Sequence, residues 1–146
     1  GGIADGRGVA ASLALGAVGV WVGTAFLVAE ESLIPDFHQE AILDGSTEDF
    51  VITRAYTGKT ARDHKNVVID AWTNSGLDPL PMPLQHVLME DFVEAAASVG
   101  RYDLTNNPVG QIAGMLKERK PAAVIMDELV RGAVDVLHGF QAIAPA

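Results

Sequence analysis

The stretch GVWVGTAFL, residues 19–27, decides the fold that the sequence predicts. It is a nearly continuous apolar run with β-branched and aromatic residues, which is typical of a parallel strand buried on both faces. Residues 6–16 precede it with helical spacing; Asp5 can cap the first helical turn, and Gly16 can supply a left-handed end. A helix followed by a buried strand predicts an α/β barrel or a doubly wound sheet.

The uncharged run from residue 8 to residue 29 has a competing interpretation. It is long enough for a membrane-spanning helix, or for a signal peptide with Arg7 as its basic start. Against this, three glycines interrupt the run, Trp21 lies in its middle rather than at an interface, and Glu30 and Glu31 provide no basic flank. We therefore expect no membrane partner.

Composition limits the function classes. The 146 residues are 49% hydrophobic and 20% charged, which is typical of one globular domain and excludes disordered and collagen-like chains. The formal charge of −9 argues against a general nucleic-acid or anionic-membrane surface, because both need a basic footprint. The absence of cysteine excludes disulfides, thiolate metal sites and a thiol nucleophile, and fits a reducing compartment, so we expect a cytoplasmic protein.

Farther along the chain, apolar periodicity and turn residues predict alternating helices, strands and loops. The predicted elements are a helix at 37–43, a strand at 49–54, a turn at 56–59, helices at 61–74 and 84–99, loops at 77–83 and 106–110, a short helix at 111–117, and a last helix starting at Pro121.

Two glycine-bearing turns are candidates for an anion site. Gly1 and Gly2 come shortly before the first predicted helix, and Gly23 and Thr24 lie late in the predicted strand. Glycine lets a ligand approach the backbone, and free N–H groups at a helix start attract phosphate without Lys or Arg. Spacing alone favours the alternative of an ordinary glycine-rich turn.

Other polar residues have two interpretations each. Four of the ten basic residues fall in one segment, where they could contact an anionic cosubstrate or form a solvated turn and helix face; they are Arg54, Lys59, Arg62 and Lys65. Glu30 and Glu31 could be catalytic acids or carboxylates that complement a helix dipole. The four histidines lack the spacing of a metal triad, so we expect no metal.

Several motifs together resemble the nitronate monooxygenase family, formerly called 2-nitropropane dioxygenases. They are GGIADGRGVAASLALG at 1–16, GVWVGTAFLVAEES at 19–32, ITRAYTGKTAR at 52–62 and GQIAGM at 110–115. The first motif is also similar to flavin-type enoyl-acyl-carrier-protein reductases and inosine-monophosphate dehydrogenases, so the combination carries the resemblance. Because the chain starts GGIADG without Met, we expect a portion of a larger fold.

The resemblance implies an α/β fold: the C-terminal part of an FMN-dependent TIM (β/α)8 barrel with a small inserted α/β domain. The implied division is residues 1–43 as barrel segment, 44–108 as inserted domain and 109–146 as the return to the barrel. It implies a cofactor site on the loop after strand seven and on strand eight, with two further residues in the substrate pocket. The cofactor residues would be Gly1, Gly2, Trp21, Val22, Gly23 and Thr24, and the pocket residues Gly110 and Gln111.

The implied reaction is oxidation of an alkyl nitronate by dioxygen to a carbonyl compound and nitrite by a flavoprotein oxidoreductase. The family's catalytic base has no counterpart in this sequence and would lie upstream of Gly1. One alternative is an NAD(P)H-dependent reductase of quinones or enoyl-acyl-carrier-protein on the same barrel. Another is a non-catalytic subunit. As partners we expect the nitronate, dioxygen and either a second copy or a complementing barrel half.

Overall fold

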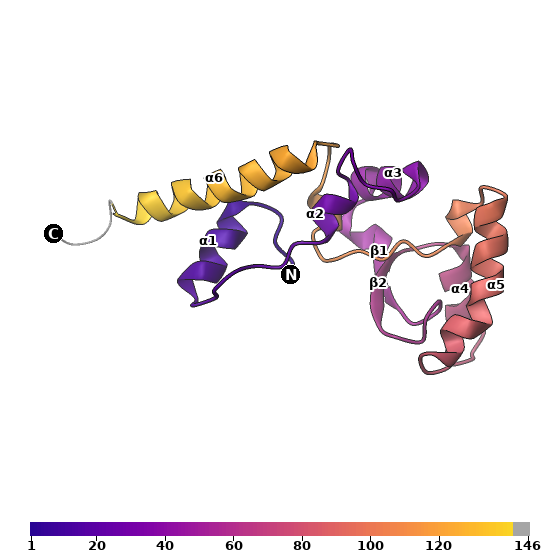
Figure 1. The fold of residues 1–146 in the computed structure, drawn as a ribbon. Coiled ribbons are helices and arrows are strands. Elements are labelled where there is room, and N and C mark those ends of the chain that lie inside the picture. The colour runs from indigo at the N-terminus through magenta and orange to yellow at the C-terminus, as the bar shows by residue number, and fades with distance from the viewer. Residues whose placement is uncertain (142–146) are drawn as a thin grey trace.

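The structure, a computed structural model, describes residues 1–141. It contains both helices and strands, as the α/β class requires, and extends from α1 and α6 at one end to α4 and α5 at the other (Figure 1). The helices are α1 (Gly6–Ala14), α2 (Thr24–Leu27), α3 (Asp36–Asp44), α4 (Val67–Asn74), α5 (Leu84–Ser98) and α6 (Ala122–Gln141); the strands are β1 (Phe50–Thr53) and β2 (Ala61–His64); 3-10 turns are η1 (Thr47–Asp49), η2 (Tyr102–Leu104) and η3 (Ala113–Met115).

Helix α1 has the predicted ends and packs on α6. The Asp5 carboxylate accepts hydrogen bonds from the N–H groups of Arg7 and Gly8 at 3.0 and 3.2 Å, and Gly16 has a φ of +95°. The two helix backbones approach closely where they cross, because a Cβ on Gly6 would lie 2.3 Å from the backbone of Gly132. Only glycine allows this contact.

The predicted strand at 19–27 is wrong. Residues 19–23 are extended chain outside any sheet, residues 24–27 form α2, and Trp21 is exposed rather than buried. A strand is stabilised by hydrogen bonds to a neighbouring strand, and no described segment pairs with residues 19–23. An apolar run alone therefore does not decide whether a segment is a strand.

The segment at 61–74 is also different from the single helix that the sequence predicts. Residues 61–64 form β2, which pairs antiparallel with β1 so that Val51 lies opposite Asp63. The helix α4 begins only at Val67, because the Asn66 side chain accepts hydrogen bonds from the N–H groups of Val68 and Ile69 and caps it. The charged sequence of β2 gave no period-2 pattern that would have indicated a strand.

Four further predicted elements are confirmed in type. The predictions for 37–43, 49–54, 84–99 and the last helix correspond to α3, β1, α5 and α6, whereas the short helix predicted at 111–117 is only the turn η3. Within the described residues, no helix is both long and apolar enough to cross a membrane. The division at residues 43 and 108 stays a prediction.

Three groups of buried side chains form the core. The first joins the start of the chain to α2 and α6 through Ile3, Ala25 and Leu129. The second lies under α3 and β1, and the third lies between the β1–β2 hairpin and helices α4 and α5. The first two groups flank residues 110–113, so they fix the position of that segment relative to α2.

Candidate functional site

The first glycine turn, at Gly1 and Gly2, contacts the GQIAGM motif at residues 110–115, which is called the GQ motif below. Gly2 has a φ of +75°, which favours glycine, and a Cβ there would lie 3.1 Å from Oε1 of Gln111. The start of the chain and residue 111 are therefore neighbours, although 108 residues separate them in the sequence. Gly1 has open space around its Cβ position.

The second glycine turn touches the same motif one residue earlier. The N–H of Gly110 donates to Oγ1 of Thr24 at 2.7 Å, and a Cβ on Gly110 would lie 2.9 Å from that oxygen. Since this hydroxyl oxygen accepts from Gly110, its own hydrogen is available to a ligand acceptor. Four of the predicted site residues thus form one cluster, consisting of Gly2, Thr24, Gly110 and Gln111.

Gly23, next to this cluster, is exposed, whereas Thr24 and Ala25 are buried. Gly23 precedes α2, and apart from its two sequence neighbours no residue of the described chain comes within 4 Å of the position that a Cβ on Gly23 would take. The N–H of Phe26 donates to the carbonyl of Gly23 at 2.9 Å, whereas the N–H groups of Thr24 and Ala25 have no acceptor within the helix.

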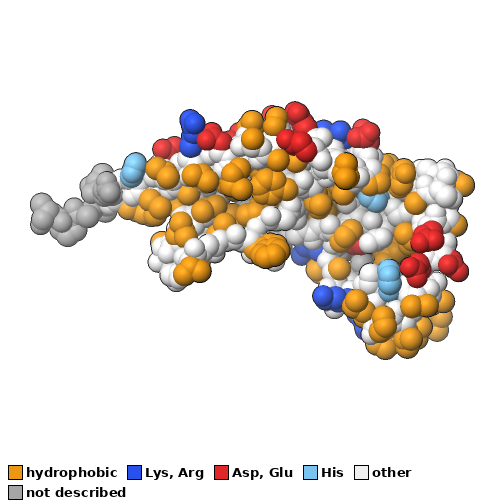
Figure 2. All heavy atoms as spheres, viewed as in Figure 1, with side chains coloured by type: hydrophobic (Ala, Val, Ile, Leu, Met, Phe, Trp, Pro, Cys, Tyr) orange, Lys and Arg blue, Asp and Glu red, His pale blue; other side chains and the backbone are white. Residues whose placement is uncertain are grey.

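Trp21 and Val22 contribute differently from the other predicted residues. Their side chains line an apolar hollow of about 340 Å³ together with residues of α1 and α6, among them Val9 and Val130. Figure 2 shows hydrophobic side chains gathered along these two helices. The two residues can therefore offer backbone groups to the cluster, while their side chains belong to an apolar surface.

The start of α1 is not a free anion site. The N–H groups of Arg7 and Gly8 already bind the Asp5 carboxylate, and the Arg7 side chain pairs with the same carboxylate. This charge pair and these hydrogen bonds keep the Asp5 pKa below its ordinary value, with the Arg7 hydrogen bond as the largest cause. These two N–H groups are therefore not free for a phosphate, while the assignment of Gly1 and Gly2 to a cofactor site stays a prediction.

A buried carboxylate holds the segment that leads to Gly110. Asp63 on β2 is 3% exposed, and its Oδ1 accepts the N–H of Asn107 at 2.6 Å. The next residues continue along β2, since Val109 donates to the carbonyl of Arg62 at 3.0 Å. Burial raises the pKa of Asp63 to about 6, despite the hydrogen bonds to the carboxylate.

His38 on α3 holds the same segment from the other side. Its Nε2 lies 2.9 Å from Oγ1 of Thr105 and 3.3 Å from the carbonyl oxygen of Tyr102, and a carbonyl only accepts, so Nε2 carries the hydrogen. The Asn107 side chain donates to the His38 carbonyl at 3.0 Å. Burial lowers the His38 pKa, so neutral imidazole is favoured. Sequence reasoning missed Asp63, Asn107 and Thr105 because nothing local indicates these long-range contacts.

The other polar candidates have local structural roles. Oε2 of Glu31 accepts the N–H of Ala122 at 2.8 Å at the start of α6, which supports the helix-dipole interpretation. Lys65 lies 3.6 Å from a carboxylate oxygen of Asp70. Among the described residues, no group of three His, Asp or Glu side chains could hold a metal ion.

Comparisons with known proteins agree with the motifs. A probable nitronate monooxygenase of Staphylococcus aureus is 38% identical over 130 residues, which cover 89% of this chain and 36% of that protein. Nitroalkane oxidase from Streptomyces ansochromogenes matches in structure with a TM-score of 0.85 at 31% identity, over 96% of this chain and 40% of the other. FabK from Thermotoga maritima matches with a TM-score of 0.79 at 30% identity, over 99% of this chain and 46% of the other.

This chain therefore spans little more than a third of the length of the curated relative. The family model described as nitronate monooxygenase matches residues 1–132 and so includes both glycine turns and the GQ motif. On this match the chain belongs to the nitronate monooxygenase family.

Proposed function

We propose that this chain binds the phosphate of FMN in an enzyme that oxidises alkyl nitronates with dioxygen to a carbonyl compound and nitrite. The observation that carries the proposal is the meeting of both glycine turns at Gly110 and Gln111. Family membership supports the same proposal. With it we propose that the chain is the C-terminal part of a TIM barrel with residues 44–108 inserted, in a cytoplasmic protein.

The cluster fits a phosphate group. The open space at Gly23 admits a ligand oxygen to the N–H groups at the start of α2, and the free hydrogen of the Thr24 hydroxyl supplies a further donor. No basic side chain is needed, because backbone N–H groups aligned at a helix start stabilise a dianion. This suits a chain with nine more acidic than basic residues.

The chain's residues bind and orient, while the cofactor supplies the redox chemistry. Bound FMN would supply the redox chemistry, the transfer of electrons from the anionic nitronate to dioxygen. Thr24 would donate to a phosphate oxygen while it accepts from Gly110, which fixes the direction of the hydroxyl hydrogen. Gln111, beside Gly2, places an amide where it can donate to an anionic substrate.

Valine at position 23 tests the phosphate site directly. Gly23 has a φ of −110° and free space at its Cβ position, so Gly23→Val keeps the fold but fills the path to the backbone. We expect FMN affinity, measured by quenching of flavin fluorescence, to fall at least roughly tenfold, which is the effect of losing one or two hydrogen bonds to a charged group. Gly19→Val is the matched control, because Gly19 also has free space and lies outside the cluster. Equal FMN affinity in both variants would contradict the proposal.

The reductase alternative is tested by the electron donor. Under anaerobic conditions, the flavin-loaded complete enzyme, with the residues that the family places upstream of Gly1, is mixed with NADH in one experiment and with an alkyl nitronate in another. We expect the nitronate to bleach the flavin absorbance and NADH to leave it unchanged. Rapid bleaching by NADH alone would favour the reductase.

A further inference from the structure

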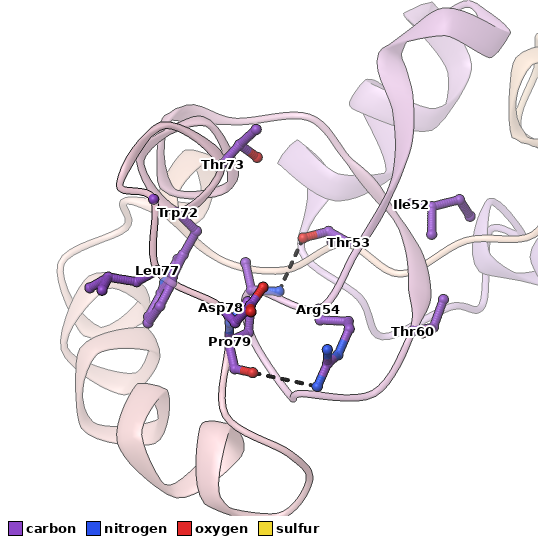
Figure 3. A pocket seen from close by; sticks show the side chains of 11 residues that line it. Ile52, Thr53, Arg54, Thr60, Trp72, Thr73, Leu77, Asp78 and Pro79 are labelled. Carbon is purple, nitrogen blue, oxygen red and sulfur yellow. Dashed lines mark hydrogen bonds between the residues drawn. The ribbon is translucent and has the colours of Figure 1, made fainter.

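A second, polar cavity lies away from the glycine cluster. It has a volume of about 470 Å³ and opens between the end of β1, the end of α4 and the loop that follows α4 (Figure 3). It shares no lining residue with the cluster of Gly2, Thr24, Gly110 and Gln111. Its polar and aromatic lining includes Thr53, Arg54, Thr60, Trp72, Thr73 and Asp78.

Arg54 presents a positive charge that no carboxylate of the described chain neutralises within 4 Å. Its Nε donates to the carbonyl of Gly58 at 3.0 Å and its Nη2 to the carbonyl of Pro79 at 3.4 Å. These two bonds hold the side chain in place and leave at least three of its five N–H donors for other acceptors. A guanidinium group that is held in place and has free N–H donors can bind phosphate or carboxylate oxygens through bidentate hydrogen bonds.

The opposite side of the cavity suits a flat ring. The Trp72 indole stands beside Leu77 and Pro79, on the far side of Asp78 from the Arg54 side chain in the close view (Figure 3). Aromatic rings stack favourably on indole, with edges left free for polar contacts. A phosphate alone would leave this apolar side of the cavity unused.

Two further polar groups lie at the cavity. The Thr53 oxygen accepts from the N–H of Ala55 at 3.0 Å, so its hydroxyl hydrogen is available to a ligand oxygen. Asp78 makes no ion pair within the described chain, and its carboxylate can accept hydrogen bonds from ligand hydroxyls. The volume lies within the range of cavities that hold small organic ligands.

We propose that this cavity binds a ring-bearing phosphate of mononucleotide size. The guanidinium of Arg54 and the Thr53 hydroxyl bind the phosphate, Trp72 stacks on the ring, and Asp78 accepts from the hydroxyls between them. Arg54, which the flavin proposal does not use, thereby gains a role. Figure 2 shows Lys and Arg side chains near the β1–β2 hairpin, where they favour the approach of an anion.

The test measures binding of AMP, GMP, CMP and UMP to the 146-residue chain. The only tryptophans are Trp21 and Trp72, so in a Trp21→Phe background the fluorescence reports on the cavity. At least one mononucleotide should quench the fluorescence of Trp72 and bind with an affinity roughly tenfold above that of adenosine or inorganic phosphate. Adenosine lacks the phosphate that Arg54 would bind, and inorganic phosphate lacks the ring that would stack on Trp72. No quenching by any of the four, or equal affinity for inorganic phosphate, would overturn the proposal.

Two pairs of variants locate the binding. Arg54→Gln should weaken the affinity roughly tenfold, whereas Lys59→Gln makes the same charge change on a residue that does not line the cavity and should have little effect. Leu77→Glu places a carboxylate at an exposed cavity position and should abolish binding without loss of fold, and Leu33→Glu, at another exposed site, should not. Loss of binding in Gly23→Val instead would place the nucleotide at the glycine cluster and refute this site.

Discussion

Replacement of Asp63 by asparagine should change how the stability of the chain depends on pH. The carboxylate is buried and accepts the N–H of Asn107 at 2.6 Å, and its pKa is raised to about 6 because burial disfavours the charge. Asparagine has nearly the same shape and keeps an oxygen for Asn107, but it cannot ionise. The comparison of the two proteins isolates the titration of one group.

The stability that Asp63 contributes decreases as the pH rises, because folding raises the pKa of its carboxyl group. The folded value of about 6 lies above the ordinary value of 3.8, so between these values the folded chain binds more protons than the unfolded chain. The stability that this group contributes is fully present below pH 3.8 and is lost as the pH rises through 6. The whole difference corresponds to about 3 kcal/mol, of which about 1.4 kcal/mol falls between about pH 5 and pH 8.

Urea unfolding of both proteins at pH 5 and pH 8, followed by circular dichroism, measures this difference. The wild-type chain should lose about 1.4 kcal/mol relative to Asp63→Asn as the pH rises. His38 and His64 also titrate with lowered pKa values, but both proteins contain them, so their contributions cancel in the comparison. The test uses only the change with pH of the stability difference between the two proteins, so the absolute stability of Asp63→Asn does not affect it.

A constant difference between the two proteins at pH 5 and pH 8 would refute the assignment. It would mean that Asp63 has the same pKa in the folded and unfolded chains, and hence that its carboxylate reaches solvent. A carbon-13 titration of the Asp63 carboxyl gives an independent value, expected at about 6.

Four further changes have clear expected results. Gly6→Ala should destabilise the chain by about 3 kcal/mol because its Cβ would lie 2.3 Å from the backbone of α6, whereas Gly139→Ala, with free space, should stabilise α6 by about 0.5–1 kcal/mol; thermal unfolding measures both. Tyr56→Phe should cost about 1–2 kcal/mol in urea unfolding, since the hydroxyl donates to a backbone carbonyl at 2.9 Å. The chain should self-associate through the exposed residues Val18 and Trp21, and sedimentation should show a monomer after both are changed to lysine.

Local sequence patterns predicted those elements whose stabilising contacts are local. The Asp5 cap and the left-handed Gly16 bound α1 with contacts at most a few residues away, and the apolar periodicity of α6 needs no partner to be recognised. The strand predicted at residues 19–27 was wrong because the conformation of this segment depends on which segments lie beside it. The prediction of a helix over residues 61–64 was wrong for the same reason, since the pairing of β2 with β1 outweighs the helical appearance of its charged residues.

The candidate site was predictable where glycine was required and unpredictable where polar groups meet over long distances. The motifs pointed to Gly2, Gly110 and Gln111, and the structure brings them together. The contact between Asp63 and Asn107 joins residues 44 positions apart. No spacing rule links such a pair, because the folded chain and not the local sequence makes them neighbours.

The glycines of the site differ in whether the packing of the chain or the binding of a ligand explains the absence of a side chain. The fold favours glycine at both Gly110 and Gly2, because a side chain at Gly110 would meet Oγ1 of Thr24 at 2.9 Å and Gly2 has a φ of +75°. Nothing in the described chain requires glycine at position 23, where φ is negative and the space is open. A residue without a side chain in open space beside a helix start is what backbone binding of a ligand demands. Gly23 is therefore the position whose substitution reports on the ligand rather than on the fold.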